Sequence, residues 1–398
     1  MTSPNAASPH ESPGAGLGPL RVSGAEAAAT LWCGSAIGSL VEGVRRERPP
    51  APVRPPSSAT LADVERALLG ATTGPVLLDG TAASRALTGI ARRDSGRPAP
   101  VAVRWGPAPA GSSPSPGSTS LDASGLDVGV LFDGFVAAGD PPTVDGFELV
   151  LLEALVERAG LASATWARGG DALFAAGDDA RRARARPRPR FLRRRFRPAS
   201  DPLDVEGARR AEVAGLEGAP IHRVSAIRAV LPTQTRDALA GFGPRAVPRT
   251  LPRDGDLAST WAATAYLGVE DLGAAARRLV LPFARPEVRT LVEALPRAVR
   301  FGRPGSGGAL PGWGARPASD ASPSFDGFAD AACRGALASR LDRAFDVAAR
   351  SKAFHADAVA ETLRRFRAGT HGWNGRRVLT IAFLALFLDR ERLALDDA

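Results

Sequence analysis

From residue 59 onwards, apolar residues recur at the spacings of helices and strands. Thr60 precedes an apolar series at helical spacing, which predicts a capped helix over residues 61–69. The short apolar run 75–78 predicts a strand, and the small-residue turn after it leads into a predicted helix over residues 86–91. A strand, a small-residue turn and a helix are how an α/β nucleotide-binding crossover begins.

The α/β pattern continues to about residue 170. Strands are predicted at residues 101–105, 128–132 and 162–166, and a helix with one apolar face is predicted at residues 147–159. The second half of the chain favours helices, at residues 258–266, 272–279, 287–295, 328–349, 356–366 and 378–388. We therefore expect an α/β fold with a doubly wound, mainly parallel sheet, followed by a helical C-terminal region.

Composition divides the chain into an extension and one large domain. Residues 1–58 are expected to be disordered or partly helical, with a Pro-rich linker over residues 46–58. The domain covers residues 59–398. Within it we expect an α/β core over residues 59–180, an Arg-rich loop over 181–200 and a mostly helical part over 201–398. The Gly-, Ser- and Pro-rich stretch 107–120 is predicted to be a loop.

The basic balance of the chain comes from one segment. The formal net charge is +9, and the ten arginines of Arg181–Arg197 account for more than that, since 9 − 10 = −1 for the rest. Arginines interleaved with Pro and Phe can bind RNA, anionic lipid or an acidic peptide. The alternative is a solvated loop, which such a run more often is.

Cysteine, histidine and hydropathy patterns indicate a cytoplasmic protein without a zinc site. Cys33 and Cys333 lie far apart, and the four histidines are scattered, so neither a disulfide framework nor zinc-ligand spacing is present. No apolar run reaches the roughly 18 residues that a membrane span needs, and the N-terminus does not have the pattern of a signal peptide. The apolar run 378–388 is therefore predicted to be a buried helix.

Candidate chemistry lies in the turns that follow two of the predicted strands. The first turn holds Asp79, Gly80, Thr81, Ser84 and Arg85. Glycines let backbone N–H groups close on phosphate oxygens, and hydroxyl and guanidinium groups add donors, so this turn is a candidate phosphate site. The alternative is an ordinary corner between a strand and a helix.

The second turn holds Gly169, Gly170 and Asp171, which follow the predicted strand 162–166. Its carboxylate is a candidate magnesium ligand, although one carboxylate alone holds magnesium poorly. The alternative is a plain turn with a capping Asp.

Three segments, in the right order, resemble the synthetase domain of the asparagine synthetase family, which includes β-lactam synthetases and lasso-peptide cyclases. The first is Val76 to Ser84, which is similar to the strand and pyrophosphate loop Ser-Gly-Gly-x-Asp-Ser. On that pattern Gly80 and Ser84 are kept. Asp79 replaces the first Ser and Thr81 the second Gly, while Ala83 replaces the magnesium-binding Asp. A carboxylate at Asp79 would repel phosphate, and this weakens the expected ATP binding.

The second segment, Trp166 to Phe174, resembles the family's Thr-Gly-Glu-Gly-x-Asp-Glu-Leu-Phe. The resemblance places the family's second magnesium-associated acid at Asp171. Arg168 stands where asparagine synthetases have Glu and β-lactam synthetases have Tyr, on the acceptor side. The chemistry of that position has therefore changed.

The third segment, Leu279 to Arg285, resembles the family's Glu-x-Arg-x-Pro-Phe-Leu-Asp through Pro282 and Phe283. The family's Glu, Arg and final Asp are replaced by Arg278, Val280 and Arg285. Further on, Ala318 stands where the family's lysine is expected.

The resemblance covers roughly residues 59–390 and implies the ATP-pyrophosphatase fold, with ATP and Mg²⁺ as cofactors. It implies an ATP-dependent ligase that forms an amide bond on a peptide or small carboxylate substrate and releases AMP and pyrophosphate. Residues 1–58 are too short for a glutaminase domain, and no Cys follows Met1. Because several charged positions have changed together, the alternatives are an inactive homologue that binds a partner and an anion-binding module that uses Arg181–Arg197 on nucleic acid or an acidic peptide.

Overall fold

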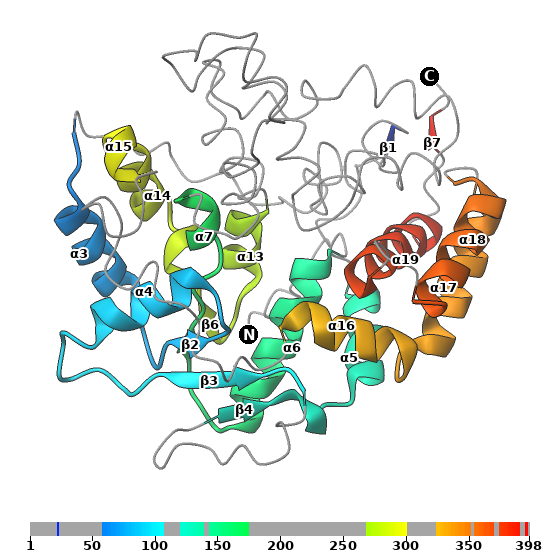
Figure 1. Ribbon diagram of the computed structural model, residues 1–398, viewed down its shortest axis with the longest axis horizontal. Coiled ribbons are helices and arrows are strands. Elements are labelled where there is room, and N and C mark those ends of the chain that lie inside the picture. The colour runs from blue at the N-terminus through cyan, green and yellow to red at the C-terminus, as the bar shows by residue number, and fades with distance from the viewer. Residues whose placement is uncertain are drawn as a thin grey trace, which may run out of the picture.

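The computed structural model describes residues 22–23, 58–106, 120–138, 143–174, 268–300, 324–351, 354–369, 374–390 and 395–396 (Figure 1). The Arg181–Arg197 segment, the predicted helix 258–266 and Ala318 lie outside these residues. So do almost all of the N-terminal extension and most of the predicted loop 107–120.

Short parallel strands form the centre of the α/β part. Strands β2 (Leu77–Leu78), β3 (Val101–Arg104) and β4 (Ser120–Asp122) pair in the order β2-β3-β4. Strand β5 (Ala164–Thr165) pairs with β6 (Leu279–Val280), and a parallel bridge between Val76 and Thr165 joins the two groups. The strands therefore run side by side as β4-β3-β2-β5-β6, which places the first strand of this series beside the fourth.

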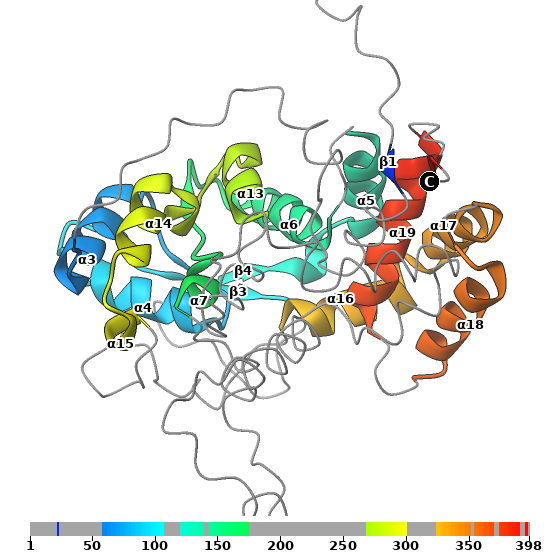
Figure 2. The ribbon, with the colours of Figure 1, turned by 90° about the horizontal axis from the view of Figure 1, so that it is seen from above.

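The helices around these strands form where the apolar spacing predicts them. Helix α3 (Leu61–Ala71) begins with a capping box, in which Thr60 and Asp63 each accept a hydrogen bond from the other's backbone N–H. Helix α4 (Ala82–Ala91) connects β2 to β3, and α6 (Val144–Arg158) precedes β5. Figure 2 shows α6 and α13 (Val269–Ala275) on one side of β3 and β4, with α4 on the other. The predictions for residues 61–69, 86–91 and 147–159 are confirmed.

The predicted strand at residues 128–132 is wrong. These residues begin helix α5 (Val128–Ala137), and the Asp127 side chain caps it by accepting from the Val130 N–H at 3.0 Å. Val128, Phe132 and Phe135 bury one face of this helix at a spacing of three to four residues, and this burial outweighs the strand preference of the Val-rich run. The strand beside β3 is instead β4, which begins at the end of the predicted loop.

Two further predictions require new boundaries. The predicted helix 328–349 is two helices, α16 (Phe325–Arg334) and α17 (Ala338–Arg350), because the chain turns at Gly335. The predicted helix 272–279 corresponds to α13, which ends at Ala275, and its last predicted residue belongs to β6. Strand β5 is shorter than the predicted 162–166. The remaining elements are η1 (Ala123–Gly125), α7 (Gly170–Leu173), η3 (Pro282–Ala284), α14 (Pro286–Glu293), α15 (Arg297–Arg300) and α18 (Ala356–Arg367).

The C-terminal helices form a separate group around α19 (Gly375–Arg390), as Figure 1 shows in orange and red. Helices α16, α17 and α18 pack on α19, which also touches α5 and α6. Nearly every residue of α19 from Gly375 to Leu388 is buried, so the prediction of a buried helix at 378–388 is confirmed. Four aromatic rings join this helix to α5 and α6: Phe132, Phe135, Phe147 and Phe383, with ring centroids 5.2–5.9 Å apart.

The two ends of the chain contribute a further pair of strands. Strand β1 (Val22–Ser23) pairs in parallel with β7 (Leu395–Asp396). Among the described residues, no helix is both long and apolar enough to cross a membrane.

Candidate functional site

The candidate residues meet where two adjacent strands end. The turn 79–81 follows β2 and the turn 166–169 follows β5, and the Val76–Thr165 bridge places these strands side by side. Because the strands are parallel, both turns lie at the same edge. In open α/β sheets, ligands bind outside the carboxyl ends of the strands, where the strand order reverses.

A glycine at the start of α7 brings the three family-like segments together. A Cβ atom added to Gly170 would lie 2.7 Å from the Ala83 Cβ and 2.7 Å from the Phe283 ring. Both distances are shorter than side chains tolerate, so only glycine fits between these neighbours. Ala83, Gly170 and Phe283 come from the first, second and third segments respectively, and they pack directly against one another.

The Asp79 carboxylate is bonded within its own turn. Its Oδ1 accepts from the Thr81 N–H at 3.0 Å and from the Thr81 hydroxyl at 2.7 Å, and its Oδ2 accepts from the Trp166 indole N–H at 3.0 Å. Gly80 between them has φ +85°, a left-handed conformation that favours glycine. Asp79 therefore holds the turn closed and ties it to the segment after β5.

Side chains of the protein also satisfy the N-terminus of α4. Thr81 is the N-cap, and its Oγ1 accepts from the Ser84 N–H at 3.1 Å. The Asp171 Oδ1 accepts from the Ala83 N–H at 2.7 Å. The first N–H groups of a helix and the positive end of its dipole favour an anion. Here that anion is the carboxylate of Asp171.

The site is electrostatically strained because two carboxylates share it. Burial raises the pKa of the Asp171 carboxyl to about 6; the Ala83 N–H opposes the rise, and the negative charge of Asp79 adds to it. Arg85 is the nearby cation, and its Nη1 donates to the Gly80 carbonyl oxygen at 2.7 Å. Its Nε lies buried without a hydrogen-bond partner among the described residues.

The described residues do not form a ready-made cage for a magnesium ion. Magnesium prefers six oxygen ligands in octahedral geometry, usually with one or two carboxylates. In the part of the chain that the structure describes, no group of three or more His, Cys, Asp or Glu side chains could hold a metal ion. Both oxygens of Asp79 and the Oδ1 of Asp171 already accept hydrogen bonds. ATP and Mg²⁺ binding therefore stay predictions.

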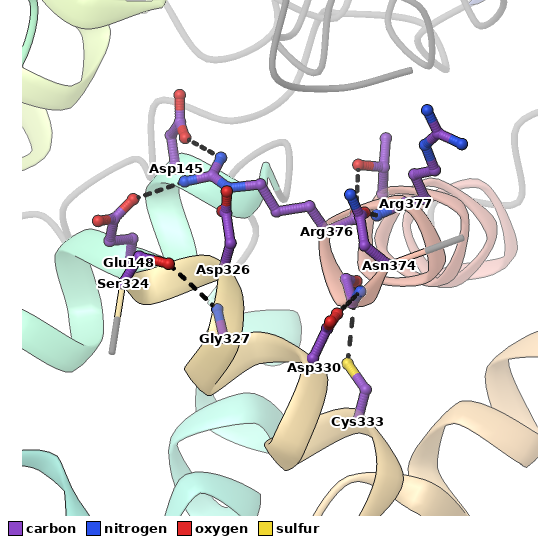
Figure 3. Close-up of polar contacts among 12 residues, drawn as sticks. Asp145, Glu148, Ser324, Asp326, Gly327, Asp330, Cys333, Asn374, Arg376 and Arg377 are labelled. Atoms are coloured by element: carbon purple, nitrogen blue, oxygen red, sulfur yellow. Dashed lines mark hydrogen bonds and ion pairs between the residues drawn. The ribbon is translucent and has the colours of Figure 1, made fainter. Parts of the chain in front are cut away.

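Arg168 lies in an ion cluster next to the candidate site. Its Nη2 is 2.5 Å from the Asp145 Oδ2, and its Nη1 is 3.7 Å from the Glu148 Oε2. Arg376, from the first turn of α19, reaches the same two carboxylates at 2.8 and 2.9 Å, and Figure 3 shows its guanidinium directed at them. Asp326 of α16 accepts from the Arg376 Nε at 2.5 Å. We call these five residues the buried ion cluster.

Within the buried ion cluster, the pKa values of Asp145 and Glu148 are shifted in opposite directions. Burial alone would raise the pKa of Asp145, but Arg168 and Arg376 outweigh it and lower the pKa to about 2. Burial raises the pKa of Glu148 to about 7; the same arginines oppose the rise, and the charges of Asp145 and Asp79 add to it. The difference arises because Asp145 holds the closer contact with Arg168.

The other arginines of the family-like segments lie elsewhere. Arg278 precedes β6, at the opposite end of the strand from the candidate site, and its Nη2 is 3.0 Å from Glu157. Arg285 is exposed at the start of α14.

Sequence reasoning missed the members of the buried ion cluster other than Arg168. One signal was present, because the pair Arg376–Arg377 stands at the head of a predicted buried helix. A buried arginine requires carboxylate partners.

Comparison of the chain with protein-family models, with curated protein sequences and with solved structures found no match.

Proposed function

We propose that this chain is a homologue of asparagine-synthetase-type synthetase domains that binds a partner and does not turn over ATP. The resemblance of the three segments implies the family, and two observations support it. The strand order β4-β3-β2-β5-β6 is compatible with the expected doubly wound sheet, whose order would reverse at the two candidate turns. The three segments also meet at one point, around Gly170.

The proposal that the chain does not turn over ATP rests on the position of the Asp171 carboxylate. It accepts from the Ala83 N–H at the N-terminus of α4, where an ATP phosphate would need that donor. A phosphate would have to displace Asp171 and then lie beside the charge of Asp79. Both changes oppose nucleotide binding, and Ala83 supplies no carboxylate for magnesium in the loop.

Among the described residues, three arginines of the family-like segments already have partners. Arg168 is held by two carboxylates of α6, and Arg278 pairs with Glu157 at the opposite end of its strand. Arg85 donates to a backbone carbonyl of its own turn. Stabilising the pyrophosphate as it leaves requires cations directed at it, and each missing contact costs a few kcal/mol.

For the partner we propose an acidic peptide, bound through Arg181–Arg197. Ten arginines without an acid in this segment supply the charge that recognises it. The competing function is that of an ATP-dependent amide ligase acting on such a peptide. That function requires the candidate site to bind a nucleotide.

Calorimetry with Mg-ATP and with Mg-pyrophosphate at millimolar concentration separates these functions. We expect no saturable binding by the unmodified chain. Asp171→Ala should bind pyrophosphate weakly, because it frees the Ala83 N–H and removes one negative charge. Asp94→Ala, a change at a half-exposed surface carboxylate, is the matched control and should gain nothing. Saturable Mg-ATP binding by the unmodified chain would overturn the proposal. If Asp171→Ala bound pyrophosphate no better than the unmodified chain, the Asp171 carboxylate would not be what blocks phosphate binding.

A further inference from the structure

The buried ion cluster joins parts of the chain that are far apart in sequence. Asp145 and Glu148 belong to α6, Arg168 follows β5, and Arg376 and Asp326 come from α19 and α16. The side chains of Glu148 and Arg376 are only 6% and 7% exposed, so water contributes little to their solvation. The cluster is thus one of the polar contacts that hold the C-terminal helices to the α/β part, beside the Arg340–Asp133 ion pair between α17 and α5.

The charges of the cluster do not balance when every member is ionised. Two arginines face three carboxylates, which gives 2 − 3 = −1 for the cluster. Asp79, in the turn after β2, adds a further negative charge that Glu148 experiences. Asp326 is half exposed, but it shares Arg376 with the two buried carboxylates, so Asp145 and Glu148 are incompletely neutralised. Incomplete neutralisation of a buried charge is costly, and the cost falls when one of these carboxylates takes up a proton.

The contacts favour Glu148 over Asp145 as the member that takes up this proton. Asp145 has two close contacts, to Arg168 at 2.5 Å and to Arg376 at 2.8 Å, whereas Glu148 has one at 2.9 Å and a longer one at 3.7 Å. Asp326 is half exposed and is solvated by water. The neutral form of Glu148 is favoured by burial, which raises its pKa to about 7.

We propose that the buried ion cluster is a pH-dependent clasp, in which protonated Glu148 holds α16 and α19 firmly against α6 and ionised Glu148 loosens them. The sign follows from proton linkage. Between its ordinary pKa of 4.5 and its folded value of about 7, Glu148 binds more proton in the closed form than in the open one. Closure is therefore strongest at low pH, and it weakens as the pH rises through 7. The clasp does not depend on the proposed function.

Hydrogen exchange of the full chain, corrected for the intrinsic effect of pH on exchange, measures the clasp. With pKa values of 4.5 open and about 7 closed, the opening equilibrium of α19 should rise on the order of 30-fold between pH 5.5 and pH 8. Glu148→Gln should abolish most of this change. Glu157→Gln, on the same helix but 65% exposed, is the matched control and should keep it.

A second variant tests the clasp without altering Glu148 itself. Asp326→Asn removes the negative charge that Asp326 places beside Arg376, so Arg376 then neutralises Glu148 more effectively. The pH at which α19 loses its protection from exchange should therefore move to a lower value. Constant protection of α19 between pH 5.5 and pH 8 would overturn the proposal. A Glu148→Gln variant that kept the full pH response, or an Asp326→Asn transition that did not move, would do the same.

Discussion

Replacing Arg376 by methionine removes the cation that three carboxylates share. Its guanidinium contacts Asp145 at 2.8 Å, Glu148 at 2.9 Å and Asp326 at 2.5 Å, and its side chain is 7% exposed. Methionine preserves most of the apolar stem, so the loss is mainly of charge. The charge of the cluster would change from 2 − 3 = −1 to 1 − 3 = −2, with two of the three carboxylates largely buried.

Removing one partner from a buried ion pair costs about 3–5 kcal/mol, because the other charge stays buried and unpaired. We expect Arg376→Met to lower the free energy of unfolding by about this amount at pH 8. The cost should be smaller at pH 5, because protonated Glu148 no longer needs the cation. Arg364→Met is the control: Arg364 also bonds a carboxylate, that of Glu361, but its side chain is 69% exposed, so the change should cost far less than Arg376→Met.

Denaturant unfolding followed by tryptophan fluorescence is the assay, because Trp105 packs on Phe325 of α16 with ring centroids 5.1 Å apart. The transition midpoint gives the free-energy change wherever the slope is unchanged. If Arg376→Met costs no more than Arg364→Met at pH 8, the buried ion cluster stabilises the fold no more than an exposed ion pair does, and the prediction is refuted.

Two further predictions concern the candidate site. Gly170→Ala should lower the free energy of unfolding by about 1–3 kcal/mol, since its Cβ would overlap the Ala83 methyl and the Phe283 ring. The double variant with Ala83→Gly should recover part of the loss. Equal denaturant midpoints for Gly170→Ala and the unmodified chain would contradict the packing. Asp171 has an ordinary pKa of 3.8 and a folded value of about 6, so its contribution to stability is full below pH 3.8 and is lost as the pH rises through 6. Denaturant midpoints between pH 4 and pH 7 should therefore fall less steeply in Asp171→Asn, and an unchanged slope would show that another group is responsible.

Local pattern was sufficient for the elements whose signal lies in their own residues. Thr60 with its apolar series predicted α3, and the run after Arg377 predicted the buried α19. It failed at residues 128–132, where a Val-rich run has both strand preference and helical spacing. Only the packing of Phe132 and Phe135 against α6 and α19 decides between the two.

The contacts of the candidate site needed the tertiary structure. The sequence identified the turns of Asp79 and Asp171, and parallel strands bring both to one edge. No local signal indicates that Asp171 bonds the Ala83 N–H, 88 residues earlier in the chain. The same holds for Arg376 and Asp145, which are 231 residues apart and whose pairing depends on how α19 packs on α6.

The candidate site and the buried ion cluster are electrostatically linked through Glu148. The charge of Asp79 helps to raise the pKa of Glu148, and Asp79 is held by Trp166, two residues before Arg168. A cation bound beside Asp79 would therefore favour ionised Glu148 and, on the clasp proposal, loosen the C-terminal helices. Linkage is reciprocal, so opening of these helices would in turn favour a cation at the candidate site.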